Sequence, residues 1–426
     1  MSGATAEARR PGFAEALEVV LRHAAGARAP GLERVALPSS MGRVLAEEVR
    51  ADRDQPPFDR ATRDGFAVRA EEWTAGRRLR VVGQVRAGEG GTGKALSSGE
   101  VVEIMTGAAV PTGADAVAMV EHAEQAESEV WAAAGRGLVA GENIVRRGSE
   151  ARRGDVLLAA GTVMGAAEIA LEATCGRTEI AVRQRPIVAI VATGDELVEL
   201  DQTPQTHQIR NSNGVALAAL VEAAGGWARR LAIARDSRED LRERIAEGRR
   251  SGLLLLSGGV SVGEYDLVEE VLAEFGAEFF FTGVRMQPGR PVVFGRLPRS
   301  ESASQRVSEP AVEREWTYFF GLPGNPVSTQ VTFHCFVGPM LRAICGAGVA
   351  GPRFVQATLA EDVRGKDGLT RILPAFLRHD LARPTVQIVQ TQGSGDLVAN
   401  ARADCYAVLP EGRDCKAGDV ISVLLR

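Results

Sequence analysis

One stretch of the chain joins an apolar strand pattern to a glycine loop and two acidic residues. Residues 253–256 are four leucines, and the segment SGGVSVGEYD that follows them ends at Asp266. Ligands of open α/β sheets bind beyond the carboxyl ends of the strands, and glycines let backbone N–H groups approach an anion closely. The loop can therefore hold a phosphate, helped by the positive end of the helix that follows. Asp266 either binds a cation that bridges this phosphate or only favours the helix dipole.

Two more loops of this kind follow expected strands. In VATGDELVE, a strand ends at Thr193 and Gly194, and Glu196 comes two residues later. In FFGLPGNPVS, residues 323–326 lead into a helix whose first position suits proline, which predicts a second set of exposed helix N–H donors. Asp236 follows ARRLAIA and is either a further site carboxylate or a solvated aspartate at a strand end. Carboxylates and phosphate-binding loops on one edge indicate a phosphate ester bridged by a metal ion.

The segment that must position these loops, residues 183–346, alternates strand and helix patterns. Buried-strand patterns occur in PIVAIVATG, ARRLAIARD and GLLLLSGG, and helical patterns occur in NSNGVALAALVEAAGG, REDLRERIAEGRR and EYDLVEEVLAEFGA. Asn213 or Ser212 is expected to cap the first of these helices. The βαβαβα order predicts a doubly wound α/β domain built on an open sheet.

The rest of the chain divides into helical and β-rich parts. Helical spacing covers residues 12–49 and returns in GAAEIALEATCG, whereas the segment between them consists of short strand patterns separated by glycine and proline. A β domain inserted into a discontinuous N-terminal domain explains this order. The expected domains are residues 10–50 with 149–182, the inserted β domain at 51–148, the α/β domain at 183–346 and a C-terminal β-barrel at 350–426.

Composition limits the classes of ligand. The formal net charge of the 426 residues is -5, which lacks the positive excess typical of nucleic-acid binding. The five cysteines are scattered without a C-x-x-C pair, which indicates reduced thiols rather than a zinc site. The sequence contains no stretch of about 18 consecutive apolar residues, which is the pattern that would predict a membrane span. We therefore expect a cytoplasmic protein that binds neither nucleic acid nor membrane and holds anionic ligands through local sites.

A further glycine-rich segment, GEGGTGKA at residues 88–95, is close to a nucleotide-binding P-loop. Alanine stands where the P-loop has the serine or threonine that binds magnesium, and the chain continues as a strand rather than a helix. We interpret the segment as a β-hairpin loop.

Several segments together carry a resemblance to a known family. In chain order they are RDGFAV, IMTGAAVPTGADAV, ENIVRRGSE, TGDEL, IRNSNG, SGGVSVGEYD and PGNPVS. The sequence resembles the molybdopterin molybdenumtransferases, the MoeA and gephyrin E-domain family. The first two segments separate this family from molybdopterin adenylyltransferases and CinA-like proteins, which share the TGDEL and SGGVSVG types of motif.

The resemblance implies a function. Family members insert molybdenum from molybdate into adenylylated molybdopterin in a Mg²⁺-dependent step that releases AMP, which completes the molybdenum cofactor. It also implies a homodimer whose cleft combines the α/β domain of one subunit with the inserted β domain of the other, and it makes molybdopterin adenylyltransferase a candidate partner. The alternative is a non-catalytic carrier or scaffold that keeps the fold and binds molybdopterin.

The resemblance also implies which side chains act. Catalytic roles fall on Asp64, Thr106, Glu150, Glu196, Asp236 and Asp266, of which Glu196, Asp236 and Asp266 would hold Mg²⁺. The substrate-binding positions are Thr193, Gly194, Ser257, Gly258, Gly259, Ser261, Gly263, Gln287, Arg290, Pro323, Gly324, Asn325, Pro326 and Ser394. The alternative for Asp64 is an ordinary Asp-Gly turn.

Two positions depart from the pattern that the resemblance leads one to expect. Glu150 stands where the family usually has aspartate, and Gln287 and Arg290 flank Pro-Gly where lysine is frequent. Glutamine removes a positive charge, whereas arginine can hold an oxyanion through two hydrogen bonds. We expect altered ligand affinity or a loss of turnover. Arg146 and Arg147 either compensate or form solvated surface.

Overall fold

The computed structural model describes residues 10–90, 95–259, 267–299, 315–379 and 383–426. These residues form two compact units. One comprises Val35–Met41 and Leu45–Ile180, and the other comprises the described parts of Met1–Arg34, Gly42–Val44 and Ala181–Arg426. In the described residues, no helix has both the length and the apolar character needed to cross a membrane. All five cysteines are free thiols.

The larger unit is built on a mixed sheet. Its strands in spatial order are β16 (Trp227–Arg230), β13 (Ile187–Ala192), β17 (Leu253–Ser257), β21 (Trp316–Leu322), β20 (Val293–Pro298) and β18 (Glu278–Thr282). The first four are parallel, and β20 and β18 are antiparallel to their neighbours. The parallel part is the doubly wound sheet that the alternating pattern predicts, and an antiparallel pair extends one side of it.

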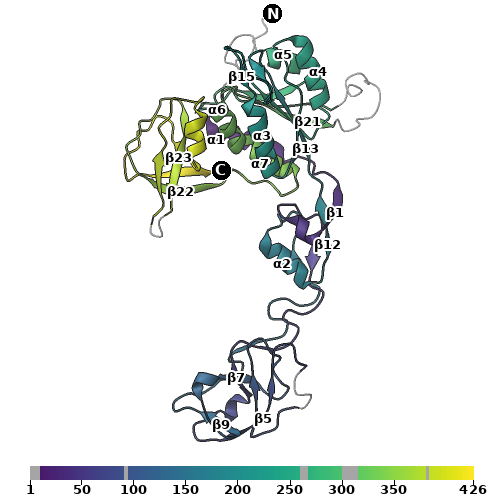
Figure 1. Cartoon of the computed structure of the whole chain (residues 1–426), viewed down its shortest axis with the longest axis vertical. Helices are drawn as coiled ribbons and strands as arrows, with labels where there is room; N and C mark the ends of the chain where they lie inside the picture. Colours follow the sequence, from purple (N-terminus) through teal and green to yellow (C-terminus); the bar gives the residue numbers. More distant parts are fainter. Residues whose placement is uncertain (1–9, 91–94, 260–266, 300–314, 380–382) are drawn as a thin grey trace, which may run out of the picture. The chain divides into compact units, whose positions relative to one another are not determined.

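Alternating side chains of β17 face two separate cores, which explains why its leucines follow one another without a break. Leu253 and Leu255 pack into a core with residues of α1 (Phe13–Ala25), α3 (Ser212–Ala223), α6 (Pro326–Thr332) and α7 (Gly338–Ile344). Leu254 and Leu256 pack with residues of α4 (Arg238–Gly248) and α5 (Leu267–Glu274). A strand covered by helices on both faces is apolar at every position. Figure 1 shows α4 and α5 on one side of β13 and β21, and α3 and α7 on the other.

Two sequence predictions about helix ends in this unit were wrong. Helical spacing was expected over residues 12–49, but α1 ends at Ala25, where Gly26 follows and the chain continues into β1 (Leu32–Ala36). The cap of α3 is Asn211, whose side chain accepts a hydrogen bond from the Gly214 N–H at 2.9 Å, rather than Ser212 or Asn213. The capping residue must lie just outside the helix, and α3 begins one or two residues earlier than the two predicted caps imply.

A closed barrel completes the larger unit. Its strands are β23 (Thr370–Arg378), β24 (Thr385–Ile388), β22 (Phe354–Leu359), β26 (Val420–Leu425) and β25 (Cys405–Leu409), and pairing of β23 with β25 closes it. The short strand β19 (Met286–Gln287) lies parallel to β23, with Gln287 opposite Arg371 in the ladder. This pairing, together with helix α8 (Leu397–Arg402), joins the barrel to the α/β sheet.

The smaller unit contains a separate mixed sheet and a short helix. The sheet order is β7 (Ala116–Met119), β4 (Gly65–Val68), β6 (Glu100–Ile104), β5 (Leu79–Val85), β9 (Glu129–Ala132) and β8 (Ala123–Ala126). The helix α2 spans Ala166–Thr174. Strands β5 and β6 are parallel. The segment 88–95 between them is therefore a crossover and not the expected hairpin loop, although residues 91–94 lie outside the described residues.

Short two- and three-residue strands form further pairs within each unit. They are β2 (Val49–Arg50) with β11 (Val156–Leu158), β3 (Arg60–Ala61) with β10 (Ile144–Val145), and β14 (Leu197–Val198) with β15 (Ile209–Arg210). The strand β1 pairs with β12 (Glu179–Arg183).

Candidate functional site

A cavity of about 1260 Å³ lies in the larger unit, at the carboxyl ends of the parallel strands and against the barrel. The structure brings together there all of the predicted residues of this unit that it describes. They are Thr193, Gly194, Glu196, Asp236, Ser257, Gly258, Gly259, Gln287, Arg290, Pro323, Gly324, Asn325, Pro326 and Ser394. Three predicted residues, Ser261, Gly263 and Asp266, lie outside the described residues.

Glycines allow the loop after β17 to press against the neighbouring strand end. Gly258 has φ +94° and Gly259 has φ +65°. A Cβ atom on Gly258 would lie 2.4 Å from the carbonyl oxygen of Thr193, and one on Gly259 would lie 2.7 Å from the Thr193 hydroxyl oxygen. Only glycine fits such positions, because a side chain would meet both strain and a clash. The backbone is thus free of side chains where it borders the cavity.

Thr193 carries a polar atom that the protein does not use. The residue is 3% exposed, and its hydroxyl oxygen is buried without a hydrogen-bond partner in the described part of the chain. Its backbone N–H donates to the carbonyl oxygen of Ser257 at 2.9 Å. A buried hydroxyl without a partner costs free energy, so such groups are rare unless they have another use. This one lies at the base of the glycine loop.

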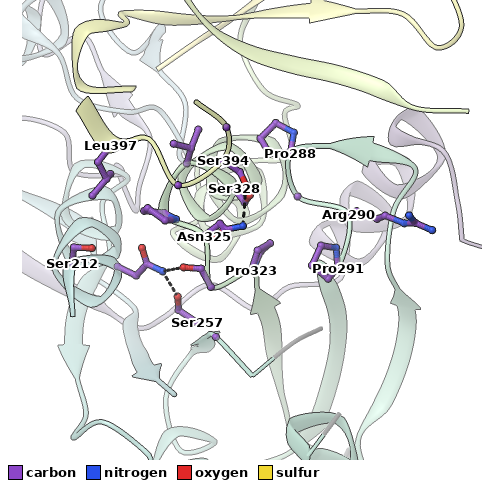
Figure 2. A pocket seen from close by; sticks show the side chains of 18 of the residues that line it. Ser212, Ser257, Pro288, Arg290, Pro291, Pro323, Asn325, Ser328, Ser394 and Leu397 are labelled. Carbon is purple, nitrogen blue, oxygen red and sulfur yellow. Dashed lines mark hydrogen bonds between the residues drawn. The ribbon is translucent and has the colours of Figure 1, made fainter. Parts of the chain in front are cut away.

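Asn213 fastens two of the predicted loops to each other. Its side-chain Nδ2 donates to the Ser257 hydroxyl at 3.0 Å and to the Gly324 carbonyl oxygen at 2.8 Å (Figure 2). Sequence reasoning considered Asn213 only as a helix cap and missed this role. The segment NSNG does contain a signal. A helix needs only one capping residue, so when Asn211 caps the helix, Asn213 is available to contact the cleft.

The barrel contributes a loop that docks on the start of α6. The Asn325 side-chain amide donates to the Ser394 hydroxyl at 2.9 Å, a contact visible in Figure 2, and the Val327 N–H donates to the Ser394 carbonyl oxygen at 3.1 Å. Pro326 occupies the first turn of α6 after the cap residue Asn325, as predicted. The prediction of exposed N–H donors at the start of α6 was wrong for Val327, because its N–H already donates to the Ser394 carbonyl oxygen of the barrel loop.

Two predicted metal ligands line the cavity without forming a complete metal site of their own. Glu196 and Asp236 are exposed, and neither forms an ion pair within the described residues. No group of three or more His, Cys, Asp or Glu side chains arranged to hold a metal occurs in that part of the chain. Mg²⁺ is commonly held by one or two carboxylates together with substrate phosphates. The two carboxylates therefore fit Mg²⁺ as a partner of a bound phosphate, and not as an ion bound by the protein alone.

Cationic side chains also line the cavity. Lys366 and Arg371 line it from the barrel, and Arg290 lines it from the segment after β19. Lys366 has no ion pair in the described residues. In Figure 2 the guanidinium group of Arg290 points away from Ser257 and Asn325, so this residue lies at the edge of the site. Sequence reasoning missed Lys366 and Arg371, because no local pattern shows that a barrel strand lies beside a distant loop.

The remaining predicted residues lie in the smaller unit. One oxygen of Asp64 accepts the Thr106 N–H at 2.6 Å and the Thr106 hydroxyl at 2.8 Å. These two hydrogen bonds stabilise the carboxylate and hold the pKa of Asp64 below its usual value. The structure thus brings Asp64 and Thr106 together at an exposed position, with the carboxylate kept ionised.

Ion pairs surround Glu150 and the two arginines near it. Glu150 lies 3.4 Å from the Arg60 guanidinium. Arg146 pairs with Asp59 at 2.7 Å, and Arg147 pairs with Asp54 at 2.8 Å. Because each arginine already has a carboxylate partner, neither offers an unpaired positive charge to replace the one that Gln287 lacks.

Comparison with known proteins covers nearly the whole chain. Family models match in three consecutive parts: the MoeA N-terminal region (domains I and II) at residues 12–176, a probable molybdopterin-binding domain at 189–343 and the MoeA C-terminal region (domain IV) at 356–425.

Individual relatives agree with this division. A protein of Staphylococcus aureus (strain COL) named molybdopterin molybdenumtransferase is 33% identical over an alignment of 401 residues, and the match covers 92% of this chain and 90% of the relative. A protein of the same name from Staphylococcus epidermidis (strain ATCC 12228) is 32% identical over 91% of this chain and 90% of its own length. The crystal structure of the molybdopterin biosynthesis MoeA protein from Pyrococcus horikoshii OT3 superposes with a TM-score of 0.77 at 25% identity, covering 98% of this chain and all of that one. Because three family models match in order along the chain and a relative of 33% identity covers 92% of it, the chain belongs to the MoeA family of molybdopterin molybdenumtransferases.

Proposed function

We propose that the protein inserts molybdenum from molybdate into adenylylated molybdopterin and releases AMP, in the last part of molybdenum cofactor biosynthesis. The observation that carries this proposal is that carboxylates and cations line one cavity beside the glycine loop. Carboxylates Glu196 and Asp236 lie at the strand ends beside the glycine loop, and the cations Lys366 and Arg371 lie on the barrel side. A phosphoanhydride with its metal suits the carboxylates, and an oxyanion such as molybdate suits the cations.

The chemistry adds water to the phosphoanhydride. One P–O bond forms to the water oxygen and the bridging P–O bond breaks, so AMP and the molybdopterin phosphate separate. Bound Mg²⁺ would offset the negative charge that develops on the phosphate oxygens. Glu196 and Asp236 would hold the ion and accept the proton of the water, and the glycine loop at Gly258 would orient the phosphate.

The resemblance extends the proposal to a symmetric homodimer. Asp64 and Thr106, which lie in the smaller compact unit, would then serve the cavity of the other subunit. Two inactive variants, Asp64→Ala and Asp236→Ala, should regain activity when they are co-expressed, since one site of a mixed dimer is free of both substitutions. Mixed dimers without activity would contradict the shared site and leave the family assignment unchanged.

The direct test uses purified protein, adenylylated molybdopterin, molybdate and Mg²⁺. AMP release is measured by chromatography, and activation of an apo-molybdoenzyme is measured in parallel. We expect both signals to need molybdate and to disappear with a chelator. Binding of molybdopterin without AMP release would instead support the carrier function. The departures at Glu150 and Gln287 are the sequence features that favour this alternative. AMP release that is unchanged in chelator would rule out the role of Mg²⁺.

A further inference from the structure

The barrel loop that reaches the cavity is tied to helix α8 as one piece. In this loop the Gly393 N–H donates to the Thr391 hydroxyl at 3.1 Å. Asp396 caps α8 by accepting the Ala399 N–H at 3.0 Å, and it also accepts the Gln392 N–H at 3.1 Å. A displacement of α8 would therefore also displace the loop that contains Ser394.

Contacts far from the cavity hold α8 against α6. Asn400 of α8 is 1% exposed, and its side-chain amide donates to the Gln330 side-chain oxygen of α6 at 3.0 Å. Arg426 donates to the same Gln330 oxygen at 3.3 Å, and also to the backbone carbonyl oxygens of Asn400 at 3.1 Å and Ala403 at 2.5 Å. Its guanidinium group lies 5.1 Å from the centre of the Tyr406 ring. One side chain thus binds the end of α8, a residue of α6 and the barrel.

We propose that Arg426 is a positioning residue for the ligand cavity. It does not line the cavity, but it donates to two carbonyl oxygens at the end of α8, where the last carbonyl groups of a helix need partners from outside the helix. The planar guanidinium can serve several acceptors at once, which a shorter or uncharged side chain cannot do. By keeping α8 on α6, Arg426 keeps Ser394 at Asn325, on the rim where the barrel meets the glycine loops.

Hydrogen exchange tests the structural half of this inference without any ligand. In the full chain, Arg426→Ala should speed exchange of the backbone amides of residues 391–402 by about tenfold, the effect of losing a few hydrogen bonds. Arg402→Ala is the matched control, because Arg402 is an exposed arginine of α8 whose side chain forms no hydrogen bond or ion pair with the described residues. Gln330→Ala removes the shared acceptor and should reproduce the pattern if Arg426→Ala fails to fold. Unchanged exchange in both variants, or an equal change in the control, would overturn the proposal.

A double-mutant cycle tests the functional half, which rests on the proposed function. Molybdopterin affinity is measured for the wild type, Arg426→Ala, Ser394→Ala and the double variant. If Arg426 acts through the Ser394 loop, Arg426→Ala should weaken binding about threefold to tenfold alone and have little further effect in the Ser394→Ala background. Additive effects, or none, would show that Arg426 does not act through this loop. A wild-type protein that fails to bind molybdopterin would contradict the proposed function, while the exchange experiment would still decide the positioning role.

Discussion

Asn213→Ala offers the sharpest test of how the cavity is built, because one amide group joins two ligand loops. The variant loses the hydrogen bonds from Nδ2 to the Ser257 hydroxyl and the Gly324 carbonyl oxygen. Each hydrogen bond contributes about 0.5–1.5 kcal/mol net, so the two together hold the loops with about 1–3 kcal/mol. Asn213 is half-buried and water can replace part of this, which favours the lower end of the range. We therefore expect molybdopterin affinity to fall about tenfold or less, since 1.4 kcal/mol corresponds to a factor of ten.

The assay compares this variant with Asn211→Ala. Asn211 caps the same helix and its loss should cost about 0.5–2 kcal/mol of stability, similar to the loss in Asn213→Ala, without separating the loops. Thermal unfolding and calorimetric titration with molybdopterin are measured for both. The expected result is a similar decrease in Tm for the two variants and a clear loss of affinity only for Asn213→Ala. Equal affinities in the two variants would refute the idea that this amide organises the binding loops.

Three further predictions concern the loops and the separate carboxylate. Thr193→Val, which removes a buried hydroxyl without a partner, should leave Tm unchanged or raised and should weaken molybdopterin binding; a lower Tm would contradict this. Gly258→Ala should lower the free energy of unfolding by about 1–3 kcal/mol or more in a denaturant titration, because φ is +94° and the new Cβ would lie 2.4 Å from a carbonyl oxygen. Gly324→Ala is the control and should change the free energy of unfolding little, because its Cβ would have no contact nearer than 3.7 Å. Thr106→Val should raise the pKa of Asp64 toward its usual value, which an NMR titration measures. The Asp64 carboxylate contributes stability that is present above its usual pKa and is lost as the pH falls through the lowered pKa, so this contribution should shrink in the variant. An unchanged titration would show that the hydroxyl does not affect the pKa of Asp64.

Local sequence signals were sufficient for the α/β sheet and for most of its loops. Four leucines followed by glycines define a buried strand and a sharp turn within a few residues, so β17 and the positions of Gly258 and Gly259 could be predicted. The proline after Asn325 marked the start of α6 for the same reason, since proline is favoured only at the first turn of a helix.

The failures occurred where the outcome depends on distant parts of the chain. Nothing in the segment between β5 and β6 shows that these strands run parallel, because a crossover and a hairpin loop can have the same glycine-rich composition. The contact of Asn213 with Gly324 joins residues 111 positions apart. Lys366 belongs to a surface loop of the barrel, and only the docking of the barrel on β19 brings it to the cavity.

The same pairing of β19 with the barrel bears on the missing charge at Gln287. In the parallel ladder Gln287 lies opposite Arg371, and both residues line the cavity. Neighbouring strands are about 4.8 Å apart, so the backbones of residues 371 and 287 are about one strand spacing apart. The Arg371 guanidinium donates to the Arg364 carbonyl oxygen at 2.5 Å, a neutral partner that leaves its charge uncompensated within the described residues. The cavity thus keeps a cation beside position 287 in a chain whose net charge is -5, so the glutamine alone does not remove its capacity to attract an oxyanion.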